Sequence, residues 1–95
     1  MSNQKVESTN VTGGKESTNL TADTLIKSGP GDLIGIFVAS QSAASVKVWD
    51  SLTAATTVLV NTTTLYAGWN SMPFPFKTGL YIDITGTIDL TVSWS

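Results

Sequence analysis

The most informative part of the sequence is the C-terminal stretch LYIDITGTIDLTVSW, residues 80–94. Apolar and polar residues alternate in it on both sides of Thr85-Gly86-Thr87. A period of two is that of a β-strand with one buried face. The stretch predicts a hairpin of two strands near 79–85 and 87–94. Keeping both apolar sets on one face gives the expected pairs Ile84 with Ile88, Ile82 with Leu90, and Leu80 with Val92.

The same alternation continues upstream as far as residue 21. Gly29-Pro30-Gly31-Asp32 has the composition of a turn. We expect eight short strands, near 22–28, 33–39, 45–50, 56–60, 63–67, 71–77, 79–85 and 87–94. Evenly spaced short strands are typical of sandwiches and barrels, and eight of them favour a jelly roll. The sequence therefore predicts an all-β protein, a jelly-roll-like antiparallel β-sandwich of about eight short strands with an extended N-terminal arm.

A second hairpin is expected from the strands near 33–39 and 45–50. In the register that aligns their apolar residues, Val38 lies opposite Val46 and Ile36 opposite Val48. Gly35 then lies opposite Trp49, whose ring would shield the glycine backbone on the outer face. Phe37 and Lys47 share that face, which is too aromatic to be plain solvent-exposed surface.

Residues 1–20 are predicted to form the extended arm, and residues 21–95 the β-sandwich domain. The arm is polar, with two isolated apolar residues, Val6 and Val11. Its sequence Glu7-Ser8-Thr9-Asn10-Val11-Thr12 recurs as Glu16-Ser17-Thr18-Asn19-Leu20-Thr21. Such a segment is either a flexible tail or a strand of chain that lies along a neighbouring subunit.

Composition narrows the functional classes. The 95 residues make one small domain with a marginal core, for which association with identical copies would add stability. There is no Cys or His, and the five basic residues are all Lys. Disulfides, thiolate metal sites and an imidazole base are therefore excluded. Ser and Thr hydroxyls without an imidazole are weak nucleophiles, and Gly13-Gly14-Lys15 does not make a phosphate-binding loop. We expect neither an enzyme nor a cofactor.

The charge and the hydropathy of the chain limit the binding partners that we expect. Charged residues make up 13% of the chain and the net charge is −2, so no basic stripe for nucleic acid is expected. The longest apolar run, residues 33–39, is too short to cross a bilayer. Residues 1–5 are polar and do not resemble a signal peptide. Neither nucleic acid nor membrane is an expected partner.

The hairpin predicted over residues 79–94 would place Asp83 opposite Asp89 on the outer face. Two carboxylates facing each other across a ladder are mutually destabilising. They are a candidate cation site, in which either a Ca²⁺ metal ion or a Lys of a neighbouring subunit, such as Lys47 or Lys77, would compensate the charge. The alternative is two solvated carboxylates that splay apart.

The segment Met72-Pro73-Phe74-Pro75-Phe76 is expected at a sheet edge, since proline cannot donate to a central ladder. Its three large side chains share one side, and they either cap the core or form an apolar contact with another subunit. Trp49, Trp69 and Tyr81 could also form a carbohydrate platform. The candidate subunit or capsid interface residues are Val6, Val11, Phe37, Trp49, Trp69, Met72, Phe74, Phe76 and Tyr81.

Several runs resemble small proteins encoded among the structural genes of tailed bacteriophages, some of which are capsid decoration (cement) proteins. The resemblance covers about residues 24–95 and is carried by GIFVAS (35–40), VKVWD (46–50), VLVNT (58–62), TGLYI (78–82) and GTIDLTV (86–92). It implies a jelly-roll-like homotrimer that binds the major capsid protein at local threefold positions on the outer capsid surface. It also implies synthesis in the host bacterial cytoplasm, and it carries no catalytic residues.

Two other interpretations remain open at this point. A receptor-binding tip of a tail fibre would also be a trimeric β-sandwich, although it usually follows a long shaft. A small carbohydrate-binding β-sandwich would be monomeric and would bind glycans through its aromatic residues.

Overall fold

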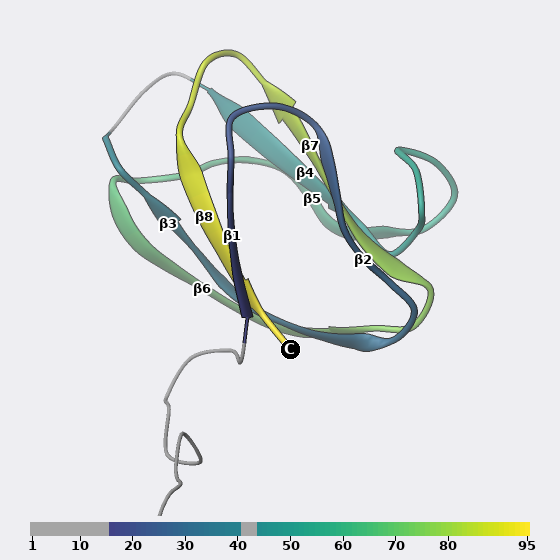
Figure 1. Cartoon of the computed structure of the whole chain (residues 1–95). Coiled ribbons are helices and arrows are strands. Elements are labelled where there is room, and N and C mark those ends of the chain that lie inside the picture. Colours follow the sequence, from purple (N-terminus) through teal and green to yellow (C-terminus); the bar gives the residue numbers. More distant parts are fainter. Residues whose placement is uncertain (1–15, 41–43) are drawn as a thin grey trace, which may run out of the picture.

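The computed structural model describes residues 16–40 and 44–95, which form eight strands and no helix. The strands build two four-stranded antiparallel sheets that face each other (Figure 1). Sheet A has the order β1-β8-β3-β6 and sheet B the order β2-β7-β4-β5. The strands are β1 (Glu16–Leu20), β2 (Thr24–Ser28), β3 (Gly31–Val38), β4 (Ser45–Trp49), β5 (Val58–Thr64), β6 (Gly68–Phe76), β7 (Gly79–Thr85) and β8 (Leu90–Trp94).

This strand order is that of an eight-stranded jelly roll, so the predicted fold class is confirmed. Two boundaries differ from the expectation. The strands expected near 56–60 and 63–67 are one strand, β5. Residues 16–20, assigned to the arm from the sequence, form β1 and belong to sheet A. The rest of the arm, residues 1–15 with Val6 and Val11, lies outside the described residues.

Both predicted hairpins are wrong. β7 pairs with β2 and β4 in sheet B, whereas β8 pairs with β1 and β3 in sheet A. Leu90 lies opposite Leu20 and Val38, not opposite Ile82. β3 and β4 likewise belong to different sheets. Alternation defines which face of a strand is buried, but two strands can bury the same face side by side or from opposite sheets.

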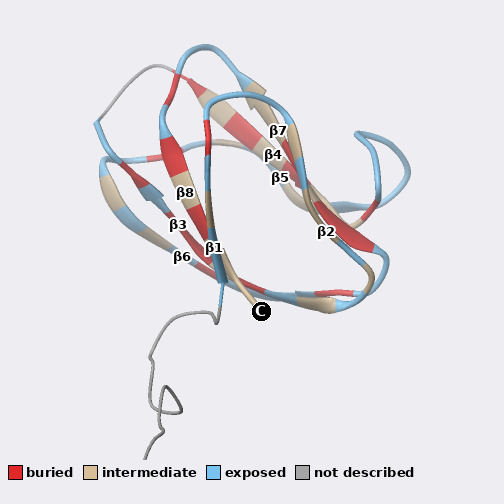
Figure 2. Ribbon diagram, in the orientation of Figure 1, coloured by how far each residue is buried: buried red, intermediate tan, exposed pale blue. Residues whose placement is uncertain are grey.

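The core fills the space between the two sheets (Figure 2). Each sheet contributes the alternate residues of its strands, as the period of two requires. In sheet A, for example, Leu20, Leu90 and Val38 form one row across three strands. The buried apolar residues are Leu20, Leu33, Ile36, Val38, Ala44, Val46, Val48, Leu65, Met72, Phe76, Leu80, Ile82, Ile88, Leu90 and Val92. Among the described residues, no helix is long and apolar enough to span a membrane.

A carboxylate joins the end of β4 to the turn that crosses from sheet A to sheet B. Asp50 accepts hydrogen bonds from the backbone N–H of Lys77 (3.0 Å to each oxygen), Thr78 (2.8 Å) and Gly79 (3.3 Å). Burial by itself would raise the pKa of Asp50. The hydrogen bonds from Thr78, Lys77 and Gly79, with the charge of Lys77, outweigh it and hold the pKa below its ordinary value of 3.8.

We expect Asp50→Ala to lower the free energy of unfolding by about 1–2 kcal/mol at pH 7, because three backbone N–H groups lose their acceptor. A carboxyl whose folded pKa is depressed stabilises the fold above its unfolded pKa, and the contribution is lost as the pH falls through the folded pKa. The difference from wild type should therefore shrink below about pH 4. Urea unfolding at pH 7 and at pH 2.5 measures both values, with Asp32→Ala, an exposed position on β3, as the control. An equal difference at the two pH values would contradict the assignment.

Candidate interaction surface

Two exposed aromatic side chains lie together on the outer face of sheet A. Phe37 on β3 and Trp69 on β6 are directly opposite in the ladder. They are 48% and 52% exposed. Opposed aromatic residues on neighbouring strands support each other, yet half of each side chain still faces solvent. A surface of this kind is typical of a contact with another molecule.

The ring of Trp69 covers a glycine on the neighbouring strand. A Cβ atom at Gly35 would lie 2.5 Å from Cζ2 and 2.6 Å from Cη2 of Trp69, and 2.6 Å from the carbonyl oxygen of Asn70. This role was predicted for Trp49, and that prediction is wrong. Trp69 covers Gly35 instead, because β3 has β6 rather than β4 as its neighbour.

The backbone before Trp69 is fixed by a single amide side chain. Asn70 Nδ2 donates to the carbonyl oxygens of Tyr66 (2.9 Å), Gly68 (3.2 Å) and Ile36 (3.3 Å). Its Oδ1 accepts from the N–H of Tyr66 at 3.3 Å. Gly68 has a φ of 95°, which other residues rarely adopt. Together they fix where β6 begins and hence where Trp69 lies.

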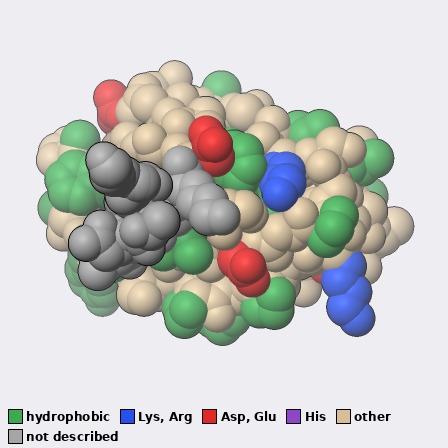
Figure 3. Space-filling view, turned by 60° about the horizontal axis from the view of Figure 1, so that its bottom comes forward, with side chains coloured by type: hydrophobic (Ala, Val, Ile, Leu, Met, Phe, Trp, Pro, Cys, Tyr) green, Lys and Arg blue, Asp and Glu red, His purple; other side chains and the backbone are tan. Residues whose placement is uncertain are grey.

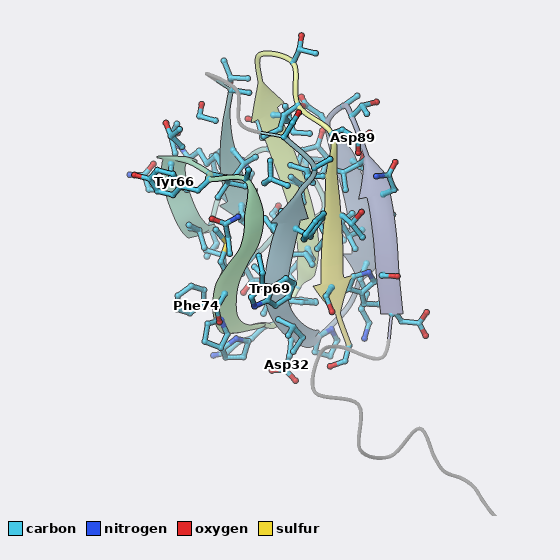
Figure 4. All side chains as sticks on the ribbon, turned by 90° about the vertical axis from the view of Figure 1, so that its left-hand side faces the viewer. Asp32, Tyr66, Trp69, Phe74 and Asp89 are labelled. Atoms are coloured by element: carbon cyan, nitrogen blue, oxygen red, sulfur yellow. The ribbon has the colours of Figure 1, made fainter. Side chains whose placement is uncertain are left out.

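The other half of this face is polar (Figure 4). The row that contains Phe37 continues to Thr91 on β8 and Asn19 on β1. Asn19 Nδ2 donates to Asp89 Oδ1 (2.7 Å), to the carbonyl oxygen of Leu90 (3.1 Å) and to Thr91 Oγ1 (3.3 Å). Sheet A therefore presents aromatic residues over β3 and β6 and hydrogen-bonding groups over β1 and β8.

β6 is one of the two edge strands of sheet A, with β1 at the other edge, so residues 72–76 lie at the sheet edge expected for them. Its large side chains divide between two environments. Met72 and Phe76 are buried in the core, so they fill the first of the two roles considered for them. Phe74 is 42% exposed at the edge (Figure 4), and it lies opposite the buried Leu33 in the ladder rather than in the row of Phe37 and Trp69. We call Phe37 and Trp69 the aromatic surface.

Trp49 and Tyr81 lie on the outer face of sheet B, on the opposite side of the sandwich from Trp69. They continue a row that begins with Leu25 on β2 and ends with Val58 on β5. Both rings are partly covered, and Lys47 Nζ lies 4.5 Å from the Trp49 ring centroid. Trp49 Nε1 is buried, without a hydrogen-bond partner in the described part of the chain. A single carbohydrate platform formed by Trp49, Trp69 and Tyr81 is therefore ruled out.

The carboxylates proposed as a cation pair are not opposite each other. Asp83 is on β7 in sheet B, where it faces Lys47 on β4. Asp89 precedes β8 in sheet A and accepts the hydrogen bond from Asn19. The predicted Asp83–Asp89 pair is wrong because it depended on a hairpin between β7 and β8, and these strands lie in different sheets. Within residues 16–40 and 44–95, no group of three or more acidic residues could hold a metal ion. On the face drawn in Figure 3, charged side chains are scattered among polar and hydrophobic ones.

Comparison with protein-family models, with curated proteins and with solved structures finds no match to this chain.

Asn70 and Asn19 make the side-chain hydrogen bonds that organise this face, and neither residue was predicted from the sequence. Asn70 follows a tryptophan at the start of an edge strand, and its value depends on the turn that folds back onto it. Asn19 lies within the second copy of the repeated ESTN sequence, which the prediction from sequence places in the arm. A repeated polar segment that ends in an apolar residue was the available signal for an edge strand.

We expect Gly35→Ala to displace the Trp69 ring and to lower the free energy of unfolding by about 1–3 kcal/mol, since the new methyl overlaps the ring and the backbone oxygen of Asn70. Tryptophan emission should shift to longer wavelength as the indole leaves the sheet. Thermal melting and fluorescence measure the two effects. Ser71→Ala, which changes an exposed residue opposite Gly35, should alter neither. A Gly35→Ala protein with native emission would contradict the contact.

Proposed function

We propose that the protein is a structural component of a tailed-bacteriophage virion, a decoration protein that binds the outer capsid surface as a homotrimer and stabilises the shell. The sequence runs that resemble such proteins, between residues 35 and 92, lie mainly on strands β3, β4, β5, β7 and β8 of the sandwich. The proposal is one of binding and assembly rather than catalysis.

The aromatic surface is the observation on which the proposal depends. Tyr, Trp and Phe are enriched at the centres of protein interfaces, where their burial contributes most of the binding energy. Phe37 and Trp69 together expose half of their side chains as direct neighbours on the outer face of sheet A. Covering that area with another protomer would supplement a core that is small for a free-standing domain.

The polar side of sheet A suits a different contact. Asn19, Thr91 and Asp89 are already joined by hydrogen bonds, so they form a rigid polar area beside the aromatic surface. We assign the aromatic surface to the contact between protomers. The arm and the polar parts of the surface would then contact the capsid. A low net charge of −2 permits close approach of identical copies.

The first test is the mass of the purified protein in solution. We expect a trimer of three 10.0 kDa chains at micromolar concentration by light scattering. Phe37→Ser combined with Trp69→Ser should dissociate it to monomers, because the protomer contact loses both aromatic residues. Tyr66→Ser, which removes a 72% exposed aromatic residue outside the aromatic surface, is the matched control. A wild-type monomer, or a double variant that remains trimeric, would contradict the proposal.

The second test is binding to particles. We expect the wild-type protein to co-sediment with phage capsids assembled without it, and electron microscopy of such particles to show density at local threefold positions. The monomeric double variant should bind at least tenfold more weakly, because it loses the avidity of three linked sites. Density at the tail instead would favour the fibre-tip interpretation.

A carbohydrate-binding module is the second candidate, and one observation favours it. Trp69 lies over Gly35 with the hydroxyl groups of Ser71 and Thr91 on the same face, an arrangement that could stack on a sugar ring. A monomer whose tryptophan emission changes on titration with oligosaccharides would support this candidate over the decoration protein.

A further inference from the structure

The backbone edge of β8 that faces away from β3 binds a strand, and in this structure that strand is β1. All five residues of β1 pair with β8 in antiparallel register, from Glu16 opposite Trp94 to Leu20 opposite Leu90. Three side chains of β1 add contacts of their own. Leu20 is 5% exposed in the core, and Asn19 makes the three hydrogen bonds described above. Thr18 Oγ1 accepts a hydrogen bond from Trp94 Nε1 at 3.3 Å.

The chain contains these residue types a second time. Glu7-Ser8-Thr9-Asn10 is identical to Glu16-Ser17-Thr18-Asn19, nine residues earlier, and Val11 stands where the later copy has Leu20. Apart from Leu20, every side chain that β1 uses on β8 is therefore present in the earlier copy. The one change, Leu to Val, keeps an apolar residue at the buried position and removes a methylene group.

We propose that residues Glu7–Val11 are a second β1 strand, which replaces Glu16–Leu20 on β8 within the same chain. Thr9 then takes the place of Thr18 beside Trp94, and Asn10 takes the place of Asn19 on Asp89 and Thr91. Val11 fills the position of Leu20 between the sheets. The inference concerns the isolated chain and does not depend on the proposed function.

The connection to β2 permits the exchange. In the described arrangement, three residues, Thr21 to Asp23, join β1 to β2. After the exchange, residues 12–23 make this connection. The loop is longer, but it still runs from the strand bound to β8 to the start of β2. Lengthening a loop from three residues to twelve disfavours it by about eightfold. Losing one buried methylene costs about a further fourfold. The earlier copy should thus occupy the site in roughly one molecule in thirty.

This ratio has a structural consequence. Whichever copy is bound, β8 keeps a partner, and its own backbone groups and the buried row of Leu90 and Val92 stay covered on the side facing away from β3. The copy not in use is available for other contacts. The site therefore tolerates the loss of either copy, and that tolerance can be measured.

The test uses full-length chains and denaturant unfolding. Asn19→Ala with Leu20→Ala weakens β1 on the order of a thousandfold if nothing replaces it. With the earlier copy available, the folding equilibrium should fall only about thirtyfold, the ratio set by the loop and the methylene. Adding Asn10→Ala and Val11→Ala should restore the full loss, whereas those two changes alone should have almost no effect.

The controls separate the exchange from its alternatives. Ile36→Ala, in a strand that the arm does not copy, should cost the same with or without the changes at residues 10 and 11. Equal losses in the double and quadruple variants would overturn the proposal. Protection by the earlier copy that grows with protein concentration would place it on another chain and overturn the intrachain form.

A pair of nine-residue deletions gives a second measurement. Deleting residues 12–20 joins Val11 to Thr21 and leaves only the earlier copy, and deleting residues 7–15 leaves only the later one. Both chains should fold, and amide hydrogen exchange should show protection of residues 7–11 in the first. A first chain that is unfolded, or that leaves residues 7–11 unprotected, would overturn the proposal while leaving the trimer and capsid tests unaffected.

Discussion

The sandwich depends on β8 lying between β1 and β3. This strand is the last in the chain, and it joins the first described strand to the middle of sheet A. Its buried residues Leu90 and Val92 are in the centre of the inner face, each with neighbours from two strands. Without β8, sheet A would separate into an isolated β1 and a β3–β6 ribbon, and the core would lose one wall.

Around this strand the two sides of sheet A differ in chemistry. Over β3 and β6 the outer face is aromatic, and the ring of Trp69 fits only because Gly35 has no side chain. Over β1 and β8 it is polar and internally hydrogen bonded. The sandwich thus separates an area suited to burial from an area suited to solvent or to a polar partner, and this separation is what makes an assembly role the better proposal.

The sequence predicted the fold class and the faces of the strands because both follow from alternation, which is local. It did not predict neighbours. Ile82 and Leu90 were assigned to one hairpin, although they reach the core from opposite sheets, since a period of two contains no information about which strand lies alongside. The same error led to the wrong predictions that Trp49 covers Gly35 and that Asp83 lies opposite Asp89. Asp50 and Asn70 were missed for a related reason, because their hydrogen bonds depend on turns whose geometry is set by the whole sandwich.

The order of the strands also bears on how the protein folds as it is synthesised. Sheet B can assemble once β7 has left the ribosome, whereas β1 has no partner until β8 follows it, some seventy residues later. Pairing of such distant segments is intrinsically slow. Because β8 follows β7 by only a few residues, β2 and β1 both gain their partners at the end of synthesis. Until then the apolar faces of the earlier strands lack the two strands that join them, which makes this late step the one at which chaperones or premature association would act.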